Sequence, residues 1–451
     1  MKINYKKTGT VLIFCFVFIY GFLIGELKIF PYLYVKSLFT KKSDDTKQQN
    51  LSEFYYGRWE KLRGQKDTTD IKEKQLKSLQ SLPYLGYGST TEKSKGTILH
   101  KPEKSYSGAT LFCSGHKPVV YLIDMDGTIL HKWEITFKEV WPDSLTFYIY
   151  KEHKQFIRRA RVYPNGDLLC VFEYIGLVKL DRHSDVIWKY TGINHHDIDI
   201  AQNKKIYSLG HSYQSVRFRY PDFPYEGRDD FILILTPDGK LLRTISIFEA
   251  FYNSNYNNFL NLINQPYFFH ANTVDIIEKP VAHKTSIFKE GDVLVSLRNI
   301  NTVAVIDIES GKVKWALNGM WNSQHQPEFL KNGNIMLFDN RGGNKKAFYK
   351  YNRSRIIEFN PFTQKLNWEY TGNDQKIFFS HWLGYNQRLP NGNTLITEST
   401  QGHIFEVTLD KEIVWEYYNT HRNGENNELI ASVMGARRLD KQSLTFLRNN
   451  H

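Results

Sequence analysis

One pattern of polar and apolar positions recurs along the chain: a polar turn, a short apolar run, a second turn and then a tryptophan. It is clearest in residues 389–393 followed by Trp415, and in residues 330–334 followed by Trp368. The apolar runs are short, rich in β-branched and aromatic residues, and bounded by Gly, Asp, Asn or Pro, which is typical of strands and hairpins. Repetition at tens of residues indicates a repeat architecture. The pattern therefore predicts a series of small antiparallel sheets.

The tryptophan position marks the length of the repeat. It recurs six times, once as arginine, with spacings that range from 47 residues (368 to 415) to 72 residues (243 to 315). Each spacing suits one four-stranded propeller blade. We therefore predict an all-β, six-bladed β-propeller over residues 109–451. The six positions are Trp133, Trp188, Arg243, Trp315, Trp368 and Trp415.

The C-terminal segment is expected to complete the ring. Residues 435–439 and 444–447 look like a further pair of inner strands. Joining the first blade would leave no free sheet edge.

The N-terminal residues predict a membrane anchor. Lys2, Lys6 and Lys7 precede an uncharged run over residues 8–25, which lies at the short end of a spanning helix. We predict a signal anchor and transmembrane helix over residues 1–26, with the propeller on the periplasmic or extracellular side of the cell membrane. A cleaved signal peptide is the alternative. Residues 27–108 are predicted to form a stalk or cap, helical near residues 71–82.

The amino-acid composition says less about possible binding partners than the repeat pattern says about the fold. The formal charge of +12 fits anionic lipid or an anionic substrate, and a solvated basic surface fits equally well. No recognised nucleic-acid-binding module is present. Cys113 and Cys170 form a candidate disulfide pair in an oxidising compartment, which the sequence alone does not decide. The oligomeric state is not determined by these features.

Histidines fall in register when the repeats are aligned on their turns. His325 lies seven residues before Asn332, and His196 lies seven before Asn203. His270 begins the corresponding strand of the fourth repeat. Because inner propeller strands line a central channel, side chains in register from several blades can converge at one end.

A second polar register follows each turn. It contains Arg298, which aligns with His211, Asn340 and Ser399, and Thr400 lies one residue further. Arginine offers a fixed donor fork to an oxyanion, and neutral imidazole can act as a nucleophile or base.

Other interpretations remain open for these histidines. They could be structural hydrogen-bonding residues, and three histidines could bind zinc. An arginine beside a divalent cation is unfavourable, so we predict neither a metal nor a cofactor. His195 is expected to face away from His196.

At these residues the chain resembles the bacterial aryl sulfate sulfotransferase family, from about Tyr106 to the C-terminus. The resemblance rests on the Pro-Asn-Gly turns and on short segments shared with the family: residues 107–112, 122–127, 195–197, 270–273, 296–299 and 324–326.

The resemblance implies sulfuryl transfer from an aryl sulfate to a phenolic or other hydroxyl acceptor, without a nucleotide sulfate donor. His325 matches the nucleophile that forms a sulfohistidine. His196, His270 and Arg298 match residues that hold the sulfuryl oxygens, and Thr400 is a further candidate for such a contact. The chain differs from better-known members by its anchor-like N-terminus and by having no cysteine after Cys170.

Two rival functions remain at this stage. A non-catalytic, membrane-anchored propeller serving as a binding scaffold would not need His325. A quinone- or metal-dependent propeller enzyme would need a carboxylate-and-amide metal set, which the sequence does not show.

Overall fold

The computed structural model describes most of the chain after the N-terminal region. The described residues are 57–62, 95–142, 156–282, 284–285, 287–342, 353–373 and 377–449. The predicted transmembrane segment over residues 1–26 lies outside them, as does the predicted helix near residues 71–82. Among the described residues, no helix is both long and apolar enough to span a membrane.

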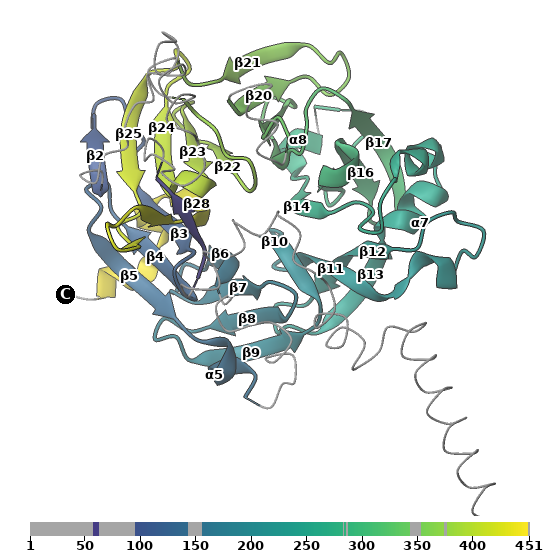
Figure 1. The fold of residues 1–451 in the computed structure, drawn as a ribbon, viewed down its shortest axis with the longest axis horizontal. Coiled ribbons are helices and arrows are strands. Elements are labelled where there is room, and N and C mark those ends of the chain that lie inside the picture. The colour runs from purple at the N-terminus through teal and green to yellow at the C-terminus, as the bar shows by residue number, and fades with distance from the viewer. Residues whose placement is uncertain are drawn as a thin grey trace, which may run out of the picture. The chain divides into compact units, whose positions relative to one another are not determined.

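The described residues form an all-β fold, as predicted. Six antiparallel sheets of four or five strands surround a common centre (Figure 1), and a smaller sheet of three strands accompanies them. In sheet order, the strands of the six are β28 (Val433–Leu439), β3 (Ala109–Ser114), β4 (Val119–Ile123) and β5 (Ile129–Glu134); β6 (Ile157–Val162), β7 (Leu168–Phe172), β8 (Gly176–Leu180) and β9 (Val186–Thr191); β10 (Asn194–Ile200), β11 (Ile206–Ser215), β12 (Arg228–Leu235) and β13 (Leu241–Ser246); β14 (Ala271–Ile276), β15 (Val293–Leu297), β16 (Thr302–Asp307) and β17 (Lys312–Asn318); β18 (His325–Phe329), β19 (Ile335–Asp339), β20 (Arg355–Phe359) and β21 (Leu366–Tyr370); and β22 (Tyr385–Arg388), β23 (Thr394–Glu398), β24 (His403–Val407), β25 (Ile413–Tyr418) and β2 (Gly96–His100).

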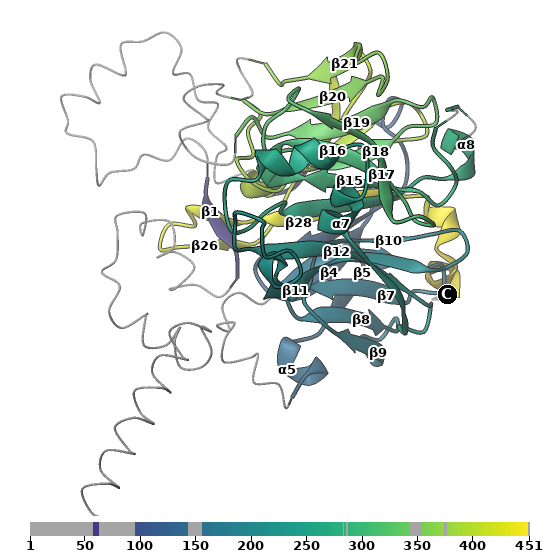
Figure 2. The ribbon, with the colours of Figure 1, turned by 90° about the vertical axis from the view of Figure 1, so that its right-hand side faces the viewer.

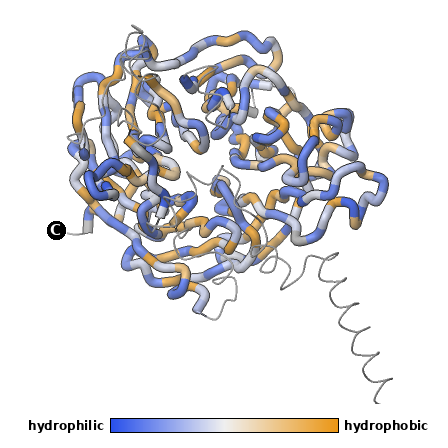
Figure 3. Tube along the Cα trace, in the orientation of Figure 1, coloured by the Kyte–Doolittle hydropathy of each residue, from blue (hydrophilic) through white to orange (hydrophobic). Residues whose placement is uncertain are grey.

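The first strand of each sheet lies toward the centre. Strands β6, β10, β14, β18, β22 and β28 contact one another in this order, and β28 returns to β6. Seen from the side, the sheets are stacked close to one another (Figure 2). Apolar stretches fall mainly within the strands and polar stretches mainly at the turns (Figure 3), so the core lies between neighbouring sheets. The arrangement is propeller-like.

The repeated tryptophans link neighbouring sheets. Each lies on the fourth strand of its sheet, and four of them donate an indole N–H to a backbone carbonyl in a turn of the next sheet. Arg243, which replaces the third tryptophan, donates to Ile308 O in the same way. Trp415 on β25 donates to Met125 O at 2.7 Å and so joins the last sheet to the first. The other bonds run from Trp133 to Gly166 O, from Trp188 to Pro237 O and from Trp368 to Leu409 O. The period read from the sequence therefore reflects contacts between repeats.

The C-terminal strand pairs as the sequence predicted. Strand β28 is antiparallel to β3, with Ala436 opposite Phe112. The predicted second strand over residues 444–447 is wrong: Leu444 lies between the 3₁₀ helices η6 (Lys441–Ser443) and η7 (Thr445–Asn449), and the other three residues belong to η7. Phe446 packs there against Trp133 with ring centroids 6.0 Å apart. The last residues thus cover an edge tryptophan instead of extending a sheet.

Part of the predicted stalk pairs with these sheets. Strand β2 pairs with β25. Strand β1 (Trp59–Lys61) pairs with β27 (Leu429–Ala431), which also pairs with β26 (Arg422–Asn423). The remaining helical elements are short: α5 (Phe137–Val140), α7 (Ile247–Tyr252), α8 (Lys279–Ala282), η2 (Val216–Phe218), η3 (Asn257–Leu262), η4 (Arg298–Ile300) and η5 (Ser399–Gln401).

Cys113 on β3 and Cys170 on β7 are both buried and free, so the candidate disulfide is not formed. Burial raises the pKa of the Cys113 thiol to about 12 and raises that of Cys170 as well. Both thiols therefore stay protonated and behave as small apolar core residues.

Candidate functional site

The inner strands are irregular where the aligned histidines lie. The antiparallel pairing shifts register after His195 on β10, after Ala271 on β14 and after His325 on β18. His196 and His270 have positive φ angles of 56° and 51°. Bulges of this kind bend a strand and redirect its side chains. They place the ring of His196 against that of His270, with Nε2 atoms 3.1 Å apart.

His325 is buried at the start of β18 and is held from one side. Its Nδ1 lies 2.8 Å from Asn340 Oδ1 and 3.1 Å from Ser323 O. Burial lowers the pKa of His325 to about 3, and the nearby positive charges of Arg298 and Arg158 contribute. The ring is therefore neutral at physiological pH.

The contacts of Asn340 determine which nitrogen of His325 carries the proton. The amide Nδ2 of Asn340 donates to Ser380 O at 2.8 Å and to Leu383 O at 2.6 Å. Because both of these partners are carbonyls, Nδ2 is fixed as the donor and Oδ1 faces His325 as an acceptor. Ser323 O is also an acceptor. The proton must then lie on Nδ1, and Nε2 of His325 keeps its lone pair for reaction.

Arg298 supplies positive charge beside these rings. It lies at the start of η4, directly after β15. Its charge contributes to lowering the pKa of both His270 and His325, each of which is lowered mainly by burial. Its side chain donates to Asn299 Oδ1 at 3.1 Å, and no carboxylate among the described residues forms an ion pair with it. A half-buried cation without a counter-ion is costly unless an anion binds there.

Arg158 is a second cation at this end of the sheets. The sequence places it in register with the histidines, but it was not predicted as a site residue. It is buried in the bulge of β6 and lies 3.3 Å from Glu173 Oε1. Its charge helps to lower the pKa of His196, after the larger effect of burial. Arg158 therefore adds to the positive field around the histidines.

Thr400 reaches His325 only through other residues. It is buried in η5, and its hydroxyl donates to Ser380 Oγ at 3.4 Å. The carbonyl of Ser380 accepts from Asn340, which contacts His325. The structure thus brings His196, His270, Arg298 and His325 close enough to influence one another electrostatically. Thr400 is connected to His325 only indirectly, through Ser380 and Asn340. Asn340, Ser380 and Arg158 are the residues that sequence reasoning missed, although Asn340 lay in the same register as Arg298.

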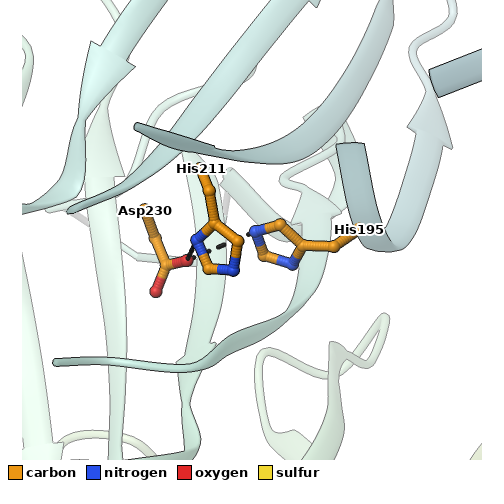
Figure 4. Close-up of side chains that lie close together, drawn as sticks. All are labelled: His195, His211 and Asp230. Carbon is orange, nitrogen blue, oxygen red and sulfur yellow. Dashed lines mark ion pairs between the residues drawn. The ribbon is translucent and has the colours of Figure 1, made fainter. Parts of the chain in front are cut away.

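His195 does not face away from His196, as the sequence analysis expected. Its Nδ1 lies 2.8 Å from His196 Nδ1. On its other side, Nε2 lies 3.2 Å from Asp230 Oδ1, which His211 Nδ1 also approaches at 2.7 Å (Figure 4). Among the described residues, His195, His211 and Asp230 are the group whose ligand atoms lie close enough together to hold a metal ion. The predicted zinc alternative at His196, His270 and His325 does not form such a group there.

A large cavity lies at the opposite ends of the inner strands. Its volume is about 790 Å³, and its wall includes Asp199, Asp275, Glu328, Arg388 and Arg437. Burial raises the pKa of Glu328 to about 7 and raises that of Asp275. The acidic wall suits an anion less well than the cluster of arginine and neutral histidines. We therefore place the candidate site at the histidine end.

Comparisons with solved structures give distant similarities. A protein of unknown function from Bacteroides caccae is 12% identical, with a TM-score of 0.46, over 73% of this chain and 98% of that chain. A streptogramin B lyase is 13% identical, with a TM-score of 0.41, over 74% and 85%. The WD40 β-propeller domain of Doa1 is 10% identical, with a TM-score of 0.37, over 66% and 73%.

The comparison with protein families is more informative than these structures. No curated protein matches the sequence. The profile of the arylsulfotransferase (ASST) family matches residues 162–421, which is more than half of the chain and contains all five predicted site residues. The chain therefore belongs to the arylsulfotransferase family.

Proposed function

We propose that this protein is a sulfuryl transferase that carries the group on His325, within a six-bladed propeller. Family membership supports aryl sulfate sulfotransferase activity. The observation that carries the mechanism is that Nδ1 of His325 faces two acceptors, Asn340 Oδ1 and Ser323 O, from which we infer that the proton lies on Nδ1 and that Nε2 is nucleophilic. The donor is an aryl sulfate, the acceptor is a phenol or another hydroxyl compound, and no nucleotide sulfate donor takes part.

The first half-reaction forms a covalent intermediate. The lone pair of His325 Nε2 attacks the sulfur atom, the bond between sulfur and the aryl oxygen breaks, and the phenolate leaves. Negative charge on the sulfuryl oxygens and on the leaving oxygen is offset by Arg298, which has no ion-pair partner among the described residues. In the second half-reaction the acceptor oxygen attacks sulfur, and the electron pair of the N–S bond returns to His325.

The location of the reaction is a further part of the proposal. The basic N-terminus and the uncharged run over residues 8–25 suit a single-pass anchor, with the catalytic sheets on the periplasmic or extracellular side. The acceptor there would be a phenolic or other hydroxyl compound.

Intact-protein mass spectrometry tests the covalent intermediate. After brief incubation with 4-nitrophenyl sulfate, the full-length protein is expected to gain about 80 Da, one sulfuryl group, with release of one equivalent of nitrophenol. Adding phenol should remove the extra mass. Nitrophenol release without an adduct would contradict the covalent mechanism, and the absence of both would favour a binding scaffold.

The pH dependence of the first half-reaction follows from the lowered pKa of His325. A base is reactive when it is unprotonated, so the rate falls only as the pH approaches its pKa from above. Because this pKa is about 3, the rate of the nitrophenol burst is expected to change less than about threefold between pH 8 and pH 5. An ordinary histidine would lose most of its activity over that range. Stopped-flow absorbance corrected for nitrophenol ionisation measures it, and a tenfold fall centred near pH 6.5 would contradict the assignment.

A further inference from the structure

We propose that Asp230 and His195 form a relay that fixes the proton of His196 on Nδ1, so that His196 Nε2 serves as the general base for the acceptor hydroxyl. This inference rests on the proposed function for the chemistry of the acceptor. The tautomer itself follows from contacts that are independent of that chemistry.

The relay begins at a fully buried carboxylate. Asp230 Oδ1 faces His195 Nε2 at 3.2 Å and His211 Nδ1 at 2.7 Å, while Oδ2 accepts from the backbone N–H of Ala271 at 3.0 Å. Contact with the two histidine rings outweighs burial and holds the pKa of Asp230 well below its usual range. The carboxylate is therefore ionised and is an acceptor only. In the part of the chain that the structure describes, the two facing ring nitrogens and this oxygen approach closely, but none of the three atoms has a partner with hydrogen-bond geometry. The ionised oxygen still favours a proton on each facing nitrogen, because a nitrogen lone pair directed at a carboxylate is repelled electrostatically.

The tautomer of His195 then determines the tautomer of His196. With a proton on Nε2, neutral His195 has a lone pair on Nδ1, which lies 2.8 Å from His196 Nδ1. His196 must donate across this contact, so its proton lies on Nδ1 and its Nε2 has a lone pair. His270 Nε2, at 3.1 Å, donates to that lone pair until the acceptor hydroxyl takes its place. Burial lowers the pKa of both His195 and His196, which keeps the two rings neutral.

One neighbouring group favours the opposite tautomer of His196. Glu173 Oε1 lies 3.6 Å from His196 Nε2 and would attract a proton there. That distance exceeds a hydrogen bond, and the same oxygen is paired with Arg158 at 3.3 Å. The 2.8 Å contact with His195 is therefore the stronger constraint.

The distances and ring orientations fit an electrostatic relay better than a zinc site. Zinc ligands at about 2.1 Å in tetrahedral geometry lie about 3.4 Å from one another. The distance from His211 Nδ1 to Asp230 Oδ1 is 2.7 Å, which is too short for that arrangement. The rings of His195 and His211 are also stacked, with centroids 4.0 Å apart and planes at 24° (Figure 4), so their lone pairs run nearly parallel instead of converging on one ion.

The relay gives the second half-reaction a complete proton path. As the acceptor oxygen bonds to sulfur, its proton moves to His196 Nε2, the N–S bond breaks, and its electron pair returns to His325 Nε2. The imidazolium formed on His196 is stabilised through His195 by the negative charge of Asp230, in the way that a buried aspartate supports the histidine of a catalytic triad. Asp230 and His195 are positioning residues in this scheme.

Asp230→Asn separates the two half-reactions. An asparagine amide facing His195 Nε2 donates instead of accepting, which reverses both ring tautomers and places a proton on His196 Nε2. The nitrophenol burst should stay within about fivefold of wild type, because a protonated Nε2 can still contact a sulfuryl oxygen. Transfer from the adduct to phenol should slow by at least about a hundredfold, which is the contribution of a general base. Asp230→Glu should recover part of that loss.

Asp229→Asn is the matched control. Asp229 is the neighbouring buried carboxylate on β12, but its contacts are to Ser246, the Phe248 N–H and Arg219, outside the relay. Both half-reactions of this variant should stay within about threefold of wild type. Equal slowing of both half-reactions in Asp230→Asn would reduce Asp230 to a structural residue and overturn the proposal.

Wild-type protein alone gives a second test that does not depend on folding of a variant. Nitrogen-15 NMR of histidine-labelled full-length protein, with the His196 signal identified by its loss in His196→Gln, should show a proton on Nδ1. A proton on Nε2 would overturn the relay, and so would one equivalent of metal in the purified protein that Asp230→Asn lacks. If wild type forms no sulfuryl adduct, the proposed function fails, while the NMR result still decides the tautomer.

Discussion

Replacing His325 with glutamine is expected to lower turnover of 4-nitrophenyl sulfate with phenol by at least about a thousandfold and to abolish the sulfuryl adduct. Glutamine can still donate to Asn340 Oδ1, so the local hydrogen bonding at β18 is largely kept. What it lacks is a nitrogen lone pair that can attack sulfur. Steady-state kinetics and intact mass spectrometry on the same preparation measure both effects.

His131→Gln is the control for loss of a histidine. His131 lies on β5 at the outer edge, where Nε2 contacts Arg182 O at 2.8 Å and the ring packs on Trp133. This variant should keep the adduct and wild-type turnover within about threefold. An adduct that persists in His325→Gln would show that another residue is the nucleophile.

Arg298→Ala is expected to reduce kcat/KM by about a hundred- to a thousandfold, the usual cost of removing one preorganised donor to a developing negative charge. The effect should be larger than for other cations because Arg298 has no ion-pair partner among the described residues, so its charge is available to the substrate. Removing it should also raise the pKa of His325 and His270, which its charge helps to lower. The measurement is kcat/KM over a series of aryl sulfates, together with its pH profile.

Two further variants test whether the charge or the donor geometry of Arg298 is needed for activity, and at which end of the inner strands the site lies. Arg298→Lys keeps the charge but loses the planar donor fork, so it should recover only part of the activity. Arg388→Ala removes an arginine from the wall of the cavity at the opposite ends of the inner strands. It should change kcat/KM by less than about threefold at a temperature where the protein is folded. If Arg388→Ala were as damaging as Arg298→Ala, the assignment of the reaction to the histidine end would be wrong.

The sequence predicted the repeat because each copy contains its own turns, apolar runs and tryptophan position within a short stretch of the chain. Each of the six sheets has its own turns, five of them have a tryptophan on the fourth strand, and these features recur along the chain at spacings of tens of residues. Even the exception was informative: Arg243 occupies the tryptophan position and makes the equivalent bond to the next sheet. The failed prediction at residues 444–447 concerned a segment with apolar residues but no repeat to define it, and its packing on Trp133 decided its conformation.

For the candidate site, the sequence predicted only the strand positions of its residues. Aligned turns placed His196, His270 and His325 at the starts of inner strands and Arg298 at the end of a second strand, because antiparallel neighbours bring those ends together. The expectation about His195 was wrong because simple alternation of side chains fails at the bulge after it, where His196 has a positive φ. A single sequence gives no local signal for a bulge at that residue.

By itself, the sequence determined an all-β chain of repeated sheets, the pairing of its C-terminal strand with the first sheet and the row of histidines at one end, since each depends on spacing along the chain. Only the tertiary structure decided the chemistry of those histidines. The proton on His325 is fixed by Asn340, whose own orientation depends on carbonyls some forty residues later, at Ser380 and Leu383. In our proposal, the proton on His196 is likewise positioned by Asp230, which contacts His195, and His195 in turn contacts His196. Tautomers and charges depend on which groups meet in space, and those contacts have no period along the chain.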